Sequence, residues 1–132
     1  MATKNLWGEL PKTLRVRLPI TVLKEQAAAL TELTDGILTG SVLTSRKGGR
    51  ISLTLRIVAP ALDGYTYDVA YANHDIEGYP LELEAAWDDE IRFECADEED
   101  FKNDLGQILT STKIQSVIQA LLVQSREVDE AG

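Results

Sequence analysis

Residues 51–57 of the chain, Ile-Ser-Leu-Thr-Leu-Arg-Ile, alternate strictly between apolar and polar side chains. Because successive side chains of a β-strand point to opposite faces, this period of two predicts a strand with one buried and one solvated face. Such a strand needs neighbours to complete its hydrogen bonds and a second layer to cover its apolar face. The chain must therefore form a sheet that is covered on one side.

The same period of two recurs in other parts of the chain. Four more segments are expected to be strands: Ile37–Ser45, Tyr65–Tyr71, Tyr79–Ala85 and Glu90–Cys95. The connections between consecutive strands are too short for the crossovers that parallel strands require. We therefore expect each strand to lie antiparallel to the next.

The last two strands are predicted to form a hairpin around residues 87–89. Their apolar side chains share one face only if opposed residue numbers add up to an even number. A three-residue loop opposes Leu83 to Phe93 and Glu84 to Arg92, which brings opposite charges together. The next permitted register would oppose Glu84 to Glu94, and like charges directly opposite are unfavourable, so we expect the first register.

Apolar residues at three- and four-residue steps predict a helix over residues 21–35. Thr21 is a suitable N-cap, and Gly36 suits the left-handed position that follows a helix. The residues before this helix, 1–19, are expected to form an ordered arm, with a short strand over 13–18.

A second helical region follows the strands. The acidic run at residues 97–100 is typical of a helix start, where negative charge meets the positive end of the helix dipole. Two apolar stripes follow that do not share one phase, so we expect either a kink or two helices, over about 98–109 and 112–125. Residues 126–132 are expected to be a frayed tail.

These elements predict an α+β fold within a single domain of residues 1–132. It consists of a five-stranded antiparallel meander sheet, an N-terminal helix, and one kinked or two consecutive C-terminal helices on one face. A chain of 132 residues can bury about two-thirds of its surface, which is enough for one hydrophobic core.

Charge is divided unevenly along the chain, whose formal net charge is -9. Residues 1–66 contain nine basic and five acidic residues, whereas residues 67–132 contain four and seventeen. Such a field repels nucleic acid and anionic membranes, and it attracts a basic protein partner. The residues predicted to bind this partner are Glu82, Glu84, Asp88, Asp89, Glu90, Glu94, Asp97, Glu98, Glu99 and Asp100.

The leading functional hypothesis is therefore a non-enzymatic interaction module that masks a basic partner, as an inhibitor, an immunity protein or a dedicated chaperone does. Solubility alone would also explain the acidity. An alternative function is the binding of a small apolar ligand in a pocket between sheet and helices, lined by Tyr65, Tyr67, Tyr71 and Tyr79. Leu121 and Leu122 would support a homodimer through the C-terminal helices if they are exposed.

The sequence offers little for catalysis. His74 and Asp75 are the one place where an imidazole could pair with a carboxylate, and no nucleophile is spaced to use it. We expect no catalytic residue, no metal site and no cofactor. Cys95 is expected to be a small apolar residue on the inner face of its strand. The N-terminal residues lack the apolar core of a secretion signal, so we expect a cytoplasmic location.

Overall fold

The computed structural model of the chain describes residues 4–11 and 17–131. Its elements are α1 (Pro19–Leu33), β1 (Thr39–Lys47), β2 (Arg50–Ala59), the 3-10 helix η1 (Pro60–Leu62), β3 (Tyr65–His74), β4 (Leu81–Ala85), β5 (Asp88–Cys95), α2 (Glu98–Leu109) and α3 (Thr112–Ala131). The five strands form one sheet in the order β1-β2-β3-β4-β5, and each neighbouring pair is antiparallel. The predicted α+β meander is confirmed.

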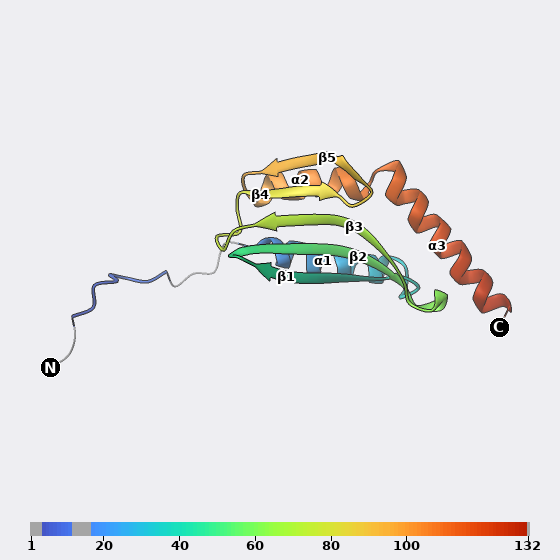
Figure 1. The fold of residues 1–132 in the computed structure, drawn as a ribbon. Helices are drawn as coiled ribbons and strands as arrows, with labels where there is room; N and C mark the ends of the chain where they lie inside the picture. The colour runs from blue at the N-terminus through green and yellow to red at the C-terminus, as the bar shows by residue number, and fades with distance from the viewer. Residues whose placement is uncertain (1–3, 12–16, 132) are drawn as a thin grey trace.

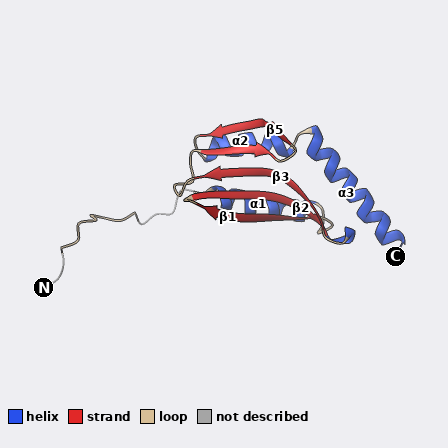
Figure 2. Cartoon of the chain, in the orientation of Figure 1, coloured by secondary structure: helices blue, strands red, loops and turns tan. Residues whose placement is uncertain are grey.

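The helices lie on one side of the sheet, which leaves the other face open (Figures 1 and 2). Helices α1 and α2 lie behind the strands, and α3 runs across the strand ends toward η1. The inward side chains of the strands and the helices form one buried core, in which Phe101 and Leu83 are fully enclosed. Polar side chains on the opposite face remain in contact with solvent, as the period-two pattern predicts.

The predicted register of the last hairpin is confirmed. Leu83 lies opposite Phe93 and Glu84 lies opposite Arg92, although the same register also opposes Glu82 to Glu94. The loop is shorter than predicted, because a register shift after Glu84 pairs Ala85 with Asp88. The strand β5 therefore begins at Asp88, inside the segment that the sequence assigns to the turn.

Helix α1 begins earlier than the sequence pattern predicts. Its first residue is Pro19, and the N-cap is Leu18, whose side chain makes no capping hydrogen bond. Thr21 is therefore not the N-cap. Proline suits the first helical position because its fixed φ is helical and its missing N–H would have had no partner there. Most of the strand predicted at 13–18 lies outside the described residues, and Arg17 and Leu18 belong to no element.

The two C-terminal helices are separate, as one of the predicted alternatives has it. The break falls at Thr110 and Ser111, where the Ser111 hydroxyl donates to the carbonyl of Ile108. Helix α3 then continues to Ala131, so the tail predicted from residue 126 is wrong for the described residues. Arg, Glu and Ala are good helix formers, which accounts for the extension.

Helix α1 approaches β1 closely at one glycine. A Cβ atom added to Gly40 would lie 2.4 Å from the Cα of Ala27, and its next neighbours would also be backbone atoms of Ala27. Backbone atoms cannot rotate away as a flexible side chain can, so only glycine fits at this position. Gly106 in α2 is the opposite case, since an added Cβ would meet no atom within 4 Å.

We therefore expect opposite effects from the same substitution at these two glycines. Gly40→Ala should lower the free energy of unfolding by at least about 2 kcal/mol, because α1 must move away from the sheet. Gly106→Ala should raise it by about 0.5–1 kcal/mol, because alanine loses less conformational freedom in a helix. Urea denaturation of both variants tests this, and a stable Gly40→Ala protein would contradict the packing described.

Candidate functional site

The predicted acidic residues follow one edge of the sheet. Glu82 and Glu84 lie on β4, four others lie on the edge strand β5, and residues 97–100 lie at the start of α2. We call these ten residues the acidic strip. Eleven of the 22 acidic residues and two of the 13 basic residues fall within residues 82–104. This segment therefore carries a net charge of -9, equal to that of the whole chain, and the rest is neutral.

The strip is a line of charge. Eight residues of a β-strand span roughly 26 Å. Asp88 is the first residue of β5 and Asp97 follows its last residue, so these two carboxylates lie far apart. Within the part of the chain that the structure describes, no group of three or more His, Cys, Asp or Glu side chains could hold a metal ion. The carboxylates of the strip are therefore spread along the edge of the sheet.

Three cations contact the strip. Arg92 Nε lies 3.9 Å from Glu84 Oε1, and Arg50 Nη2 lies 3.7 Å from Glu82 Oε2. Lys102 Nζ lies 2.7 Å from Glu98 Oε2, and its hydrogen bond lowers the pKa of that carboxyl. Such ion pairs at the protein surface contribute little to stability, and they leave most of the strip without a compensating charge.

Some of the acidic side chains have structural roles. Asp97 is the N-cap of α2 and accepts a hydrogen bond from the backbone N–H of Asp100 at 2.9 Å. The Asp100 carboxylate in turn accepts from the N–H of Ala96 at 3.2 Å. This reciprocal arrangement resembles a capping box and fixes where the helix begins. These two carboxylates are therefore less available to a partner.

Other residues of the strip remain exposed. Asp89, Glu94 and Glu99 face solvent, and no hydrogen bond or ion pair from their side chains is recorded among the described residues. They lie on β5 and on the first turn of α2, so they are distributed along the whole strip. These three carboxylates are the ones best placed to meet a cationic partner.

The four tyrosines predicted to line one pocket lie in three places. Tyr65 and Tyr67 line a shallow depression against α3, together with Leu62 and Leu121. Tyr71 lies on the open face of the sheet, where its hydroxyl donates to Asp68 Oδ2 at 3.3 Å.

Tyr79 lies before β4, and its hydroxyl donates to the carbonyl of Arg17 at 2.9 Å. Burial raises the pKa of Tyr79 to about 12. The structure therefore does not bring the four rings together.

A β-bulge explains this separation. The pairing of β2 with β3 shifts between Leu55 and Arg56, which leaves Val69 as an extra residue. Val69 and Ala70 are both buried, so the inward set changes from odd to even numbers at this point. Tyrosines before the bulge face the helices, whereas Tyr71, after it, faces the solvent. Strict alternation cannot reveal such a change.

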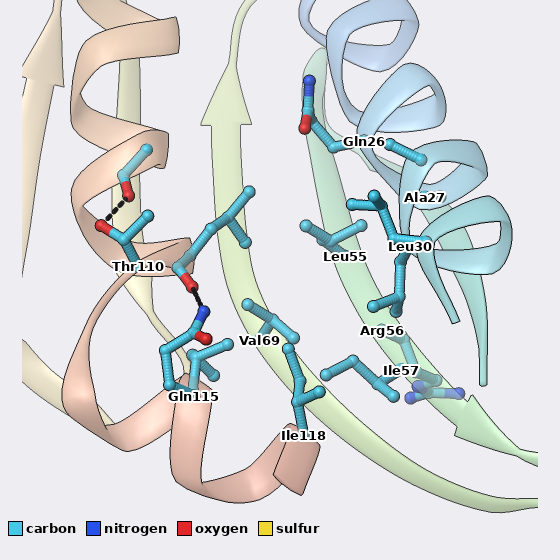
Figure 3. Close-up of a pocket in the computed structure, with 15 residues that line it drawn as sticks. Gln26, Ala27, Leu30, Leu55, Arg56, Ile57, Val69, Thr110, Gln115 and Ile118 are labelled. Carbon is cyan, nitrogen blue, oxygen red and sulfur yellow. Dashed lines mark hydrogen bonds between the residues drawn. The ribbon is translucent and has the colours of Figure 1, made fainter. Parts of the chain in front are cut away.

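A different cavity lies on the helical side of the sheet. Between the C-terminal halves of α1 and α2 there is a groove of about 330 Å³ (Figure 3). Its floor is formed by Leu55, Ile57 and Val69, and Ile118 of α3 closes one end. We call this the apolar groove. Its volume lies at the lower end of the range for small-molecule sites.

Three of the polar side chains that line the apolar groove already make hydrogen bonds within the protein. The Gln115 side-chain amide donates to the carbonyl of Leu109 at 2.9 Å, and the Thr110 hydroxyl donates to that of Gly106 at 2.7 Å. Arg56 donates to Asp68 at 2.7 Å. The groove therefore favours an apolar occupant over one that needs hydrogen bonds. The sequence analysis did not predict this groove, because its walls come from helices that are far apart in the sequence, α1 on one side and α2 and α3 on the other.

Of the two residues considered for catalysis, His74 is buried and Asp75 is exposed. His74 is 4% exposed, and its Nδ1 lies 2.6 Å from the backbone oxygen of Asp75. The Asp75 carboxylate instead accepts a hydrogen bond from Arg50. The expected inward position of Cys95 is confirmed, and its thiol donates to Asp104 Oδ2 at 3.4 Å.

The C-terminal helix exposes fewer apolar residues than a dimer surface of Leu121 and Leu122 would require. Leu121 is buried in the protein's own core, and Leu122 is half-buried. Val123 and Val128 are exposed by 49% and 46%. A homodimer through the C-terminal helices stays a prediction, but the buried Leu121 is not available as its contact.

Among the described helices, none is both long enough and apolar enough to cross a membrane. No protein-family model matches the chain, and neither a curated protein nor a solved structure is significantly similar to it. The function must therefore be inferred from the residues and their geometry.

Native Cys95 should react very slowly with alkylating reagents. Burial and the neighbouring Asp104 raise the pKa of its thiol from 9.0 to about 12, which lowers the thiolate population near pH 8 roughly thousandfold. The rate of alkylation by iodoacetamide is measured by mass spectrometry for protein kept in native buffer and for protein unfolded in urea, and the two rates are compared. Equal rates in the two buffers would show that the thiol is accessible in the folded protein.

Proposed function

We propose that the protein is a non-enzymatic interaction module that binds a basic protein partner through the acidic strip. The observation that carries this proposal is the concentration of the entire net charge of -9 in residues 82–104. Solubility requires only net charge, and it does not require that the acidic residues be concentrated at one edge of the sheet. An inhibitor, an immunity protein or a dedicated chaperone, acting in the cytoplasm, would use such a surface.

The length and exposure of the strip support a protein partner. A line of carboxylates over roughly 26 Å matches a basic helix or an extended Lys/Arg-rich segment. Like-charge repulsion disfavours nucleic acid and anionic membrane on the same surface. Electrostatic complementarity of this kind acts mainly on the association rate, so the rate is the quantity to measure.

Reversing the charge of the three exposed carboxylates should slow association. Affinity capture from a lysate of the native source identifies the partner, and the association rate is then measured at low and at physiological salt. The triple variant Asp89→Lys, Glu94→Lys and Glu99→Lys should lower the low-salt rate at least tenfold and remove most of its salt dependence.

A matched control separates the strip from net charge alone. Glu32, Glu77 and Glu127 are exposed acidic residues outside the strip, and changing them to lysine alters the net charge by the same amount. The control should retain the association rate within about threefold. Equal slowing by both triple variants would show that the partner senses the overall charge and not this edge.

The apolar groove favours a second candidate function, the binding of a small apolar ligand. This alternative rests on the 330 Å³ cavity and its largely aliphatic lining, and no longer on the four tyrosines. The alkyl chain of a fatty acid has the chemistry that such a lining accommodates, because the alkyl chain needs no polar partner inside the cavity. The carboxylate would remain in solvent at the open side of the groove.

Filling the groove should abolish this binding. If dodecanoate binds there, a concentration 100 times Kd should stabilise the protein by about 2.7 kcal/mol, which a thermal shift detects. Gly106→Leu places a side chain into the groove and should remove the shift, whereas Gly106→Ala should keep it. No shift in the unmodified protein, or the same shift in Gly106→Leu, would exclude this cavity as the dodecanoate site.

A further inference from the structure

We propose that the protein forms a two-fold symmetric homodimer in which β1 of one copy pairs antiparallel with β1 of a second copy. The two sheets would join into one sheet of ten strands, with the helices of both copies on the same face. The proposal rests on the chemistry of the two sheet edges, on the backbone groups that β1 leaves unpaired, and on the charge distribution.

The two edges of the sheet differ in composition. The edge strand β5 carries five charged residues among eight, and charge on an edge strand opposes pairing with another sheet. The edge strand β1 has no charge over Thr39–Ser45 and no proline. A long edge strand without such protection is a template for pairing, and among the described residues β1 has one strand neighbour, β2, while helix α1 packs against its first residues.

The backbone groups available on β1 follow from its hairpin. Lys47 and Arg50 flank the two-residue turn Gly48-Gly49, whose positive φ angles of 58° and 81° are those of a type I′ turn. The flanking pair of such a turn is hydrogen-bonded, so odd-numbered residues of β1 face β2 and even-numbered residues face outward.

One hydrogen bond supports this assignment independently. The N–H of Gly40 donates to the hydroxyl of Thr31 in α1 at 3.2 Å, so this even-numbered amide points away from β2. Helix α1 therefore covers the edge at its beginning. The amides and carbonyls of Val42, Thr44 and Arg46 follow on the same side and remain available to a second strand.

A second copy satisfies these groups in a self-complementary register. Pairing about Leu43 aligns Val42 with Thr44 of the second copy, and it aligns Arg46 with Gly40, whose own N–H stays bonded to Thr31. Leu43 is 41% exposed on the open face and would lie against Leu43 of the second copy. This contact buries apolar surface, and the register keeps the basic residues of the two copies apart.

The charge distribution also favours pairing through β1. Two chains of net charge -9 repel each other, and the repulsion is greatest where their acidic strips meet. Pairing through β1 places the two β5 strands at opposite ends of the joined sheet, nine strand spacings or roughly 43 Å apart. This distance exceeds the Debye length of about 8 Å several times, so the strips hardly interact at physiological salt.

Sedimentation equilibrium of the full chain up to about 1 mM tests the dimer, and hydrogen exchange followed by NMR tests its location. In the dimer, the amides of Val42, Thr44 and Arg46 should exchange at least tenfold more slowly at high than at low protein concentration. The amides of Leu43 and Ser45 should be protected at both concentrations, because they bond β2. This alternation is specific to pairing at the β1 edge.

Two variants weaken the edge without touching the core. Leu43→Lys places like charges opposite each other, and Thr44→Pro removes an outward N–H while leaving the bonds to β2 intact. Each should raise the dissociation constant at least tenfold, with circular dichroism confirming the fold. Val123→Lys, on the exposed face of α3, is the matched control and should leave the dimer unchanged.

Each result decides the proposal. A chain that stays monomeric at about 1 mM, with the three outward amides unprotected, overturns it. A dimer that Val123→Lys dissociates, while Leu43→Lys does not, assigns the interface to α3 and also overturns it. Concentration-dependent protection of the alternate β1 amides supports it even if one variant fails to fold.

Discussion

The backbone of α1 rests on the backbone of β1 at Ala27 and Gly40, and this contact determines how the helical layer is arranged. Because no side chain separates them there, α1 is held over the first two strands. Helix α2 packs against β4 and β5 at the other side of the sheet. Where the two helices diverge, the inward residues of the central strands form the floor of the apolar groove. The groove thus follows from where the first helix is fixed.

Much of the fold could be predicted because it depends on periods that the sequence displays directly. The structure has the predicted strand at residues 51–57, and it places Glu84 opposite Arg92. Element ends were less predictable, since they depend on single residues. Pro19 starts α1 in place of a capping side chain, and the two-residue turn before Asp88 lengthens β5.

The candidate sites were predictable only in part, for a physical reason that particular residues make clear. Charge is a property of sequence segments, so the acidic strip could be located before its geometry was known. A pocket depends on which residues the topology brings together. The bulge at Val69 separates Tyr71 from Tyr65 and Tyr67, and the apolar groove joins Leu30 to Ile118 across most of the chain. Neither relation has a local signal.

The confinement of net charge to residues 82–104 gives the molecule a strong electric dipole. A cationic body approaching from any side exerts a torque on such a dipole and turns the acidic edge toward itself before contact. The protein would then be oriented before the partner docks, and a larger fraction of encounters would lead to binding. Joined through β1, two such dipoles would oppose each other and form a linear quadrupole that is negative at both ends. A polycation with two separated basic segments could then bridge neighbouring dimers into chains.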